Sequence, residues 1–301
     1  MVNGQTPSST DPHDYPEVYL LGAPKCGTTT IASWLAAHSA VHSSPTKEPL
    51  HFYSPYGTSM TTEAYLGLYS PERTGGLLRF DASVWNLYAE HAVAGILAVR
   101  PDARFIVCLR NPADMAVSLH SQKLAIGHEK LNKFSDAWAA SSRRAQGERV
   151  GIFGIGNCDP RHMDYRTVCS IGTQVRRLNT QVERSRVLYL SLDSLAADPE
   201  ATWEQLCSHL DLANEPIELR AQNVRTSTHR SQLVVRTVKR LGAARTKLGI
   251  SRGFGVASLV EKLNSRDGSY GSPDRDLAEE LRTFFSEETS ILAAETGLEF
   301  S

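Results

Sequence analysis

A short glycine loop at residues 22–30, Gly-Ala-Pro-Lys-Cys-Gly-Thr-Thr-Thr, has residue types that can bind a phosphate. An apolar run at 18–21 precedes it, and apolar residues follow at helical spacing, which predicts a strand, a tight turn and a helix start. Such a turn directs backbone N–H groups and the positive end of a helix dipole at one point. The loop is therefore a candidate phosphate site, and a purely structural turn is the alternative.

The position of the lysine distinguishes this loop from that of common ATPases. A Walker A loop carries its lysine directly after the second glycine, where it reaches the outer phosphates. Here Gly22 and Gly27 keep the glycine spacing, but Thr28 stands at the lysine position and Lys25 lies inside the loop. This arrangement suits a nucleotide with a short 5′ group, because Lys25 can then contact the bond that breaks. A small-molecule kinase that uses ATP and Mg²⁺ is the disfavoured alternative.

A second candidate phosphate ligand, Arg110, ends the β-rich apolar run at residues 104–109. Asn111 can cap a helix and Pro112 suits its first position, so Arg110 is expected at the carboxyl end of a strand. Open α/β sheets bind their ligands at that edge. A guanidinium binds phosphate through paired, charge-assisted hydrogen bonds, although a structural ion pair is the alternative.

These two segments together resemble the sulfotransferases that use 3′-phosphoadenosine 5′-phosphosulfate (PAPS). Residues 23–30 resemble the family's 5′-phosphosulfate loop, and residues 104–112 followed by Ser118 resemble its 3′-phosphate motif. The resemblance implies that Arg110 and Ser118 hold the 3′-phosphate. It also implies that the 5′ group is held by Lys25, Cys26, Gly27, Thr28, Thr29 and Thr30.

The segment at residues 45–53 carries two candidates for a general base, Glu48 and His51, beside aromatic residues. A surface lysine–glutamate pair and a half-buried histidine are the plain alternative. Carbohydrate sulfotransferases have a similar Lys-Glu segment running into His-Phe-aromatic, and its glutamate is the proposed base. This chain has one residue more between Glu48 and His51 than the common form, so the base is either Glu48 or His51.

Two further segments resemble parts of the same family. Residues 80–88 resemble the segment that lines the acceptor cleft, where Trp85 and Tyr88 could stack on a ring, with core packing as the alternative. Of two late glycine-containing loops, the one at residues 264–271 is preferred as the loop over the 3′-phosphate. It would contribute Arg266 and Gly268, and a solvent-exposed loop is the alternative.

The predicted fold is a single α/β domain with a central parallel sheet flanked by helices, in the P-loop-like sulfotransferase architecture that the resemblance implies. Residues 1–15 are predicted to be a disordered leader, and the domain is expected to span 16–301. Strands are predicted at 18–21, 104–109 and 186–190. We expect residues 60–100 to be helical and irregular.

Two further local patterns concern helices. Asp198 followed by Pro199 is expected to start a helix. In an earlier predicted helix, Arg176 and Arg177 are expected to lie on a solvated face.

Composition bounds the possible partners. The chain has 301 residues and a net charge of −1, so it does not require nucleic acid or an anionic membrane as partner. Its five cysteines show no zinc-ligand spacing, and no metal is expected, because lysine and backbone dipoles supply the positive charge. The sequence has no secretion signal and no apolar run of membrane-spanning length, so a cytoplasmic location is expected.

The resemblance then predicts the reaction. The chain would transfer a sulfuryl group from PAPS to a hydroxyl or amine, and 3′,5′-ADP would be the product. The acceptor would be a carbohydrate, a glycolipid or a small-molecule metabolite. A non-catalytic nucleotide-binding protein on the same scaffold is a further alternative.

Overall fold

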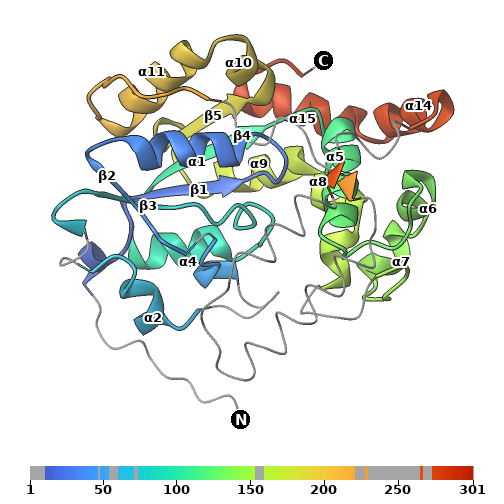
Figure 1. The fold of residues 1–301 in the computed structure, drawn as a ribbon, viewed down its shortest axis with the longest axis horizontal. Coiled ribbons are helices and arrows are strands. Elements are labelled where there is room, and N and C mark those ends of the chain that lie inside the picture. The colour runs from blue at the N-terminus through green and yellow to red at the C-terminus, as the bar shows by residue number, and fades with distance from the viewer. Residues whose placement is uncertain are drawn as a thin grey trace. The chain divides into compact units, whose positions relative to one another are not determined.

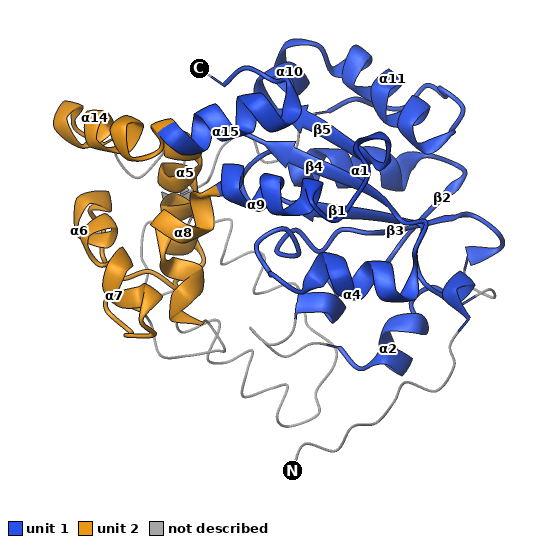
Figure 2. Ribbon diagram, turned by 180° about the vertical axis from the view of Figure 1, so that it is seen from behind, with its two compact units in different colours: residues 1–111, 171–222, 287–301 blue, residues 112–170, 223–286 orange. Residues whose placement is uncertain are grey.

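The computed structural model of the chain describes residues 11–46, 48–53, 60–70, 74–152, 159–220, 228–229, 265–266 and 273–300. The chain forms two compact units (Figure 2). The first unit comprises residues 1–111, 171–222 and 287–301, and the second comprises residues 112–170 and 223–286.

The first unit is built on a five-stranded, all-parallel sheet in the order β2-β3-β1-β4-β5 (Figure 1). The strands are β1 (Val18–Gly22), β2 (Val41–Ser43), β3 (Leu78–Asp81), β4 (Arg104–Leu109) and β5 (Val187–Ser191). Helices flank this sheet, which confirms the α/β architecture predicted from the sequence.

The helices and short 3₁₀ turns of the first unit follow the strands in the usual βα order. They are η1 (Pro12–Asp14), α1 (Thr28–Ala37), η2 (His51–Tyr53), α2 (Thr62–Leu66), α4 (Ala92–Val99), α9 (Ile171–Asn179), η4 (Arg184–Arg186), α10 (Leu192–Ala197), α11 (Pro199–Leu210) and α15 (Ser286–Thr296). Helix α11 begins where the Asp-Pro pair predicts, since the Asp198 side chain accepts a hydrogen bond from the Ala201 N–H.

Strand β1 lies at the centre of the sheet, between β3 and β4. All five residues of β1 are buried, as expected for a parallel strand covered on both faces. Strand β1 pairs with β4 from Val18–Arg104 to Gly22–Val107, with a bulge between Leu20 and Gly22. The chain leaves β1 toward β2 and leaves β4 toward β5, so these neighbouring strands form the switch point where such sheets bind ligands.

Two parts of the first unit differ from the expectations. Residues 60–100 contain strand β3, so the prediction of helical and irregular structure there is incomplete. This four-residue strand, Leu-Arg-Phe-Asp, is too short and too polar to stand out as a strand pattern. Near the N-terminus, residues 1–10 lie outside the described part, whereas η1 is helical and Tyr15 is buried against Tyr65. The boundary of the predicted leader stays a prediction.

The second unit is mainly helical, with a short antiparallel strand pair. Its elements are α5 (Pro112–Ala125), α6 (Phe134–Ala139), α7 (Ser141–Ala145), η3 (Pro160–Met163), α8 (Tyr165–Cys169), β6 (Thr228–His229), β7 (Ser265–Arg266) and α14 (Arg275–Phe284). None of the helices in the described part of the chain combines the length and the apolar character that crossing a membrane requires.

A buried ion pair organises the second unit. Arg144 and Glu129 are both fully buried, and their side chains form two hydrogen bonds of 2.8 and 2.9 Å. The Tyr165 hydroxyl donates to the same carboxylate at 2.9 Å. Arg144 also donates to the Val150 and Met163 carbonyls, so the buried charges have close partners.

Candidate functional site

The glycine loop joins β1 to α1 as the sequence predicts. Gly22 ends β1, and Gly27 is the N-cap of α1 with φ +90°. A Cβ on Gly27 would lie 2.8 Å from Leu195 Cδ2, and a Cβ on Gly22 would lie 2.9 Å from the Val84 carbonyl oxygen. Both positions therefore require glycine, for close approach and, at Gly27, for the left-handed backbone.

Lys25 and Arg110 are brought to the same edge of the sheet by strand pairing. The Ala23 N–H donates to the Cys108 carbonyl at 2.7 Å, which joins the start of the loop to the end of β4. Lys25 and Arg110 each follow this hydrogen bond by two residues. Lys25 and Arg110 therefore both follow the carboxyl ends of the neighbouring strands β1 and β4.

The pKa of the Cys26 thiol is affected by the positive charges at this edge of the sheet. Burial raises its pKa to about 12, and the positive charges of Arg110 and Lys25 act in the opposite direction. Both cations therefore influence one point inside the loop. Of the threonines that follow, Thr28 and Thr30 are buried at the start of α1, and Thr29 is half-buried.

The segment with the two candidate bases has an unusual backbone. Glu48 and Leu50 are not glycine, yet their φ angles are +54° and +55°. The Leu50 N–H donates to the Ser83 hydroxyl at 3.0 Å. His51 Nδ1 lies 2.9 Å from the Met60 carbonyl, which can only accept, so a neutral His51 has its proton on Nδ1 and Nε2 as its acceptor.

Trp85 and Tyr88 lie beside this segment. Both are half-buried, and their rings meet edge to face at 6.1 Å. They pack on a small cluster that includes Tyr53 and Leu50, so core packing accounts for part of their surface and the rest is accessible. The same cluster connects them to the segment that carries Glu48.

Arg177 is a residue whose role the sequence did not indicate. Its Nη2 donates to the Leu87 carbonyl at 2.5 Å and to the Tyr88 carbonyl at 3.2 Å. The prediction of a solvated side chain is therefore wrong for Arg177, because carbonyl groups far away in the sequence bind it. Arg176 is exposed, as predicted, and pairs with Glu295 at 3.2 Å.

The predicted residues of the first unit share one edge of the sheet. Parallel strands end at the same edge of the sheet. Lys25 follows β1, Glu48 and His51 follow β2, Trp85 and Tyr88 follow β3, and Arg110 follows β4. Sequence positions more than 80 residues apart therefore lie at one edge of the sheet, the edge at which open α/β sheets bind ligands.

The remaining predicted residues belong to the second unit. Ser118 lies on α5 and is half-buried. Arg266 belongs to β7, whose backbone pairs with Thr228 of β6, but its side chain lies outside the described residues. Gly268 also lies outside the described residues.

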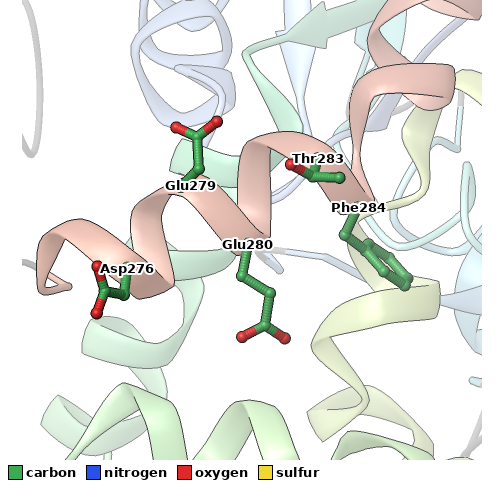
Figure 3. A pocket seen from close by; sticks show the side chains of 5 residues that line it. All are labelled: Asp276, Glu279, Glu280, Thr283 and Phe284. Atoms are coloured by element: carbon green, nitrogen blue, oxygen red, sulfur yellow. The ribbon is translucent and has the colours of Figure 1, made fainter.

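A pocket elsewhere in the described part of the chain does not belong to this site. A shallow pocket on α14 is lined by Asp276, Glu279, Glu280, Thr283 and Phe284, none of which belongs to the predicted site (Figure 3). Within the described ranges, no group of three histidine, cysteine, aspartate or glutamate side chains is placed to hold a metal ion.

Comparison with known families identifies the chain's family. A model described as the sulfotransferase domain matches residues 15–253, a range that includes parts of both units. The chain belongs to this sulfotransferase family. This membership confirms the resemblance inferred from the glycine loop and the segment around Arg110.

The chain is also similar to two individual proteins whose names include sulfotransferase. Bifunctional heparan sulfate N-deacetylase/N-sulfotransferase 1 of Xenopus laevis is 29% identical over 116 residues, which are 37% of this chain and 13% of that protein. The protein of the same name from Caenorhabditis briggsae is 22% identical over 220 residues, 67% of this chain and 23% of that protein. The chain thus matches less than a quarter of the length of either relative.

A solved structure has the same fold. The crystal structure of a sulfotransferase from Alicyclobacillus acidocaldarius superposes with a TM-score of 0.70 at 20% identity. The match covers 95% of this chain and 97% of that one. The sulfotransferase fold therefore extends over nearly the whole chain.

Proposed function

We propose that the chain transfers a sulfuryl group from PAPS to a hydroxyl or amine. The observation that carries this proposal is the joint placement of Lys25 and Arg110, each two residues beyond the hydrogen bond between Ala23 and Cys108. One cation follows the loop that suits a 5′ group, and the other ends the strand that suits a second phosphate. A donor with phosphates at both positions, such as PAPS, makes use of both.

The donor would be held mainly by the first unit. The start of α1, with Gly27 and residues 28–30, would receive the 5′-phosphate, because a helix N-terminus binds anions. Arg110 would hold the 3′-phosphate through paired, charge-assisted hydrogen bonds. Ser118, Arg266 and Gly268 would assist there, as the resemblance implies.

The transfer would be a single displacement at sulfur. The acceptor oxygen or nitrogen attacks the sulfur, and the bond from sulfur to the 5′-phosphate oxygen breaks, releasing 3′,5′-ADP. Lys25 would stabilise the negative charge that grows on that oxygen, an effect worth about 3–4 kcal/mol for one well-placed donor. Glu48 or His51 would take the proton that the acceptor loses.

The acceptor would be a carbohydrate, a glycolipid or a small-molecule metabolite. Two heparan sulfate N-deacetylase/N-sulfotransferases are among the relatives, which favours a glycan as the acceptor. Their names also favour an amine as one group that accepts the sulfuryl group. Trp85 and Tyr88 would contact the acceptor, because half-buried aromatic rings suit the faces of sugars or other rings. The proposed location is the cytoplasm.

Calorimetric titration with 3′,5′-ADP, 5′-AMP and ATP with Mg²⁺ tests this proposal. We expect 3′,5′-ADP to bind much more tightly than 5′-AMP, because only the former has a 3′-phosphate for Arg110. An Arg110→Ala variant should reduce the affinity for 3′,5′-ADP toward that for 5′-AMP. Binding of ATP with Mg²⁺ without binding of 3′,5′-ADP would instead favour a kinase.

A further inference from the structure

The segment with the candidate bases, residues 48–51, cannot hold its backbone by local preference. This base segment has two non-glycine residues, Glu48 and Leu50, in the left-handed region. This region is unfavourable for residues that have a side chain, so contacts from elsewhere must stabilise the conformation. Two of the described contacts of this segment lead to one buried side chain, Asp81 at the end of β3.

The first connection runs through Ser83. Its hydroxyl accepts the Leu50 N–H at 3.0 Å, although the two residues lie 33 positions apart. Ser83 is fully buried, and its own N–H donates to Asp81 Oδ1 at 2.7 Å. Asp81 thus fixes the turn that presents the serine hydroxyl to the base segment, two residues after Glu48.

The second connection runs through Tyr65. Its hydroxyl donates to the other carboxylate oxygen, Asp81 Oδ2, at 2.7 Å. The Tyr65 ring is stacked on the His51 ring, with centroids 4.4 Å apart and an angle of 11° between the planes. The orientation of His51 therefore also depends on a residue that Asp81 holds.

We propose that Asp81 is a positioning residue for sulfuryl transfer, which places both candidate bases through Ser83 and Tyr65. This inference rests on the proposed function. Asp81 is 1% exposed and has no access to substrate, so it acts only through the base segment. Because each carboxylate oxygen serves a different connection, one side chain couples the backbone beside Glu48 to the ring of His51.

Two variants interrupt the network at different points. Ser83→Ala removes the hydroxyl that binds the Leu50 N–H and keeps the bond from the Ser83 N–H to Asp81. Asp81→Asn keeps an oxygen for the Ser83 N–H and replaces the acceptor of the Tyr65 hydroxyl. Tyr189→Phe is the matched control, since Tyr189 is another buried tyrosine of the first unit, whose hydroxyl donates to Asn179 Oδ1 at 2.6 Å.

Hydrogen exchange of the full chain tests the positioning without any acceptor. In Ser83→Ala, we expect the Leu50 amide to exchange at least about tenfold faster, while the amides of β1 and β4 stay unchanged. In Asp81→Asn, the peptide that contains residues 48–53 should show faster exchange. Tyr189→Phe should match the wild type there. Wild-type exchange of this peptide in both Ser83→Ala and Asp81→Asn would overturn the inference.

Turnover then separates positioning from general damage to the fold. Release of 3′,5′-ADP from PAPS is followed with N-desulfated heparin as the acceptor and, in parallel, with water alone. We expect kcat to fall about tenfold in both variants, a part of the 10²–10⁴ of general-base catalysis. The affinity for 3′,5′-ADP should stay within about twofold. Equal losses in kcat and in 3′,5′-ADP affinity would overturn the inference.

Failure of the proposed function gives a different result. A wild-type chain that neither binds 3′,5′-ADP nor consumes PAPS refutes sulfuryl transfer, and Asp81 then has no reaction to serve. A wild-type chain that binds 3′,5′-ADP and turns over PAPS, with wild-type kcat in Ser83→Ala and Asp81→Asn, refutes only the role of Asp81.

Discussion

Glu129 and Asp81 are both buried carboxylates, but their surroundings differ. Glu129, in the second unit, faces the Arg144 guanidinium through two hydrogen bonds and accepts a third from the Tyr165 hydroxyl. The backbone N–H groups of Lys130 and Leu131 also donate to it, each at 2.9 Å. Its charge therefore has a buried counter-charge and a full set of donors.

Asp81, in the first unit, has fewer partners. Its close donors, the N–H and the hydroxyl of Ser83 and the hydroxyl of Tyr65, are all neutral. Burial raises the pKa of Asp81, and these hydrogen bonds lower it by less. The carboxylate at the end of β3 is thus less compensated than the one in the second unit.

The difference in surroundings indicates a different role for each carboxylate. A buried carboxylate with a cation and five hydrogen bonds is costly to disrupt and has no capacity left for chemistry. A carboxylate with a perturbed pKa at the ligand-binding edge of a sheet fits a functional site better. We therefore expect Glu129 to govern stability and Asp81 to govern activity.

The largest expected effect tests the role of Glu129. Replacing Arg144 with Gln leaves the Glu129 charge buried without its counter-charge, which should lower the free energy of unfolding by about 3–5 kcal/mol. Arg143→Gln is a matched control on the same helix, because Arg143 and its partner Glu148 are exposed. It should cost at most about 1 kcal/mol. Urea denaturation measures both, and equal losses would contradict the comparison.

The second prediction concerns Lys25, the residue proposed to act directly on the breaking bond. Lys25→Ala should reduce kcat for PAPS by about 10²–10³, the loss of about 3–4 kcal/mol of transition-state stabilisation. The free energy of unfolding should change by less than about 1 kcal/mol. Arg176→Ala, an exposed site in the same unit, serves as the control with unchanged kcat. Near-wild-type turnover in Lys25→Ala would remove that residue from the mechanism.

The smallest effect concerns the pH dependence of stability. Because the pKa of Asp81 is raised in the folded state, the folded chain binds this proton more tightly than the unfolded chain. Stability should therefore fall as pH rises above the unfolded value of about 3.9, until the folded pKa is passed. Asp81→Asn removes the contribution of this carboxyl group to the pH dependence. The free energy of unfolding of the wild type should therefore fall relative to that of the variant as pH rises.

Urea denaturation between pH 4 and pH 8 measures this difference. The ionisable groups that face Asp81 are Tyr19, Tyr65, Tyr69 and His51. Burial raises the pKa of the three tyrosines, so they stay neutral over this range, and both proteins contain His51. Parallel curves for the two proteins would show that Asp81 does not titrate differently on folding.

The strand–turn–helix units that carry the proposed donor residues could be predicted from the sequence, because their patterns are local. An apolar run, two glycines at a fixed spacing and a helical pattern lie within about twenty residues, and the same holds for β4 and Arg110. The required glycine conformation at Gly27 follows from the same short segment. Local patterns of this kind specify a strand–turn–helix unit without knowledge of the rest of the fold.

The acceptor side could not be predicted in the same way, because it depends on distant contacts. The hydrogen bond between Leu50 and Ser83 spans 33 residues, and the bonds from Arg177 reach back about 90. Strands β2 and β3 have only three and four residues, so their alternation gives little signal. Asp81 and Ser83 are ordinary polar residues in the sequence, and only the parallel sheet gives them a role.

The burial of Cys26 has a practical consequence for work with this protein. A cysteine in a nucleotide loop is usually a target for alkylating reagents and peroxides, which attack the thiolate. With a pKa of about 12, roughly one molecule in 10⁵ carries that thiolate at pH 7. Maleimide labels and peroxides should therefore leave the thiol of the glycine loop unmodified.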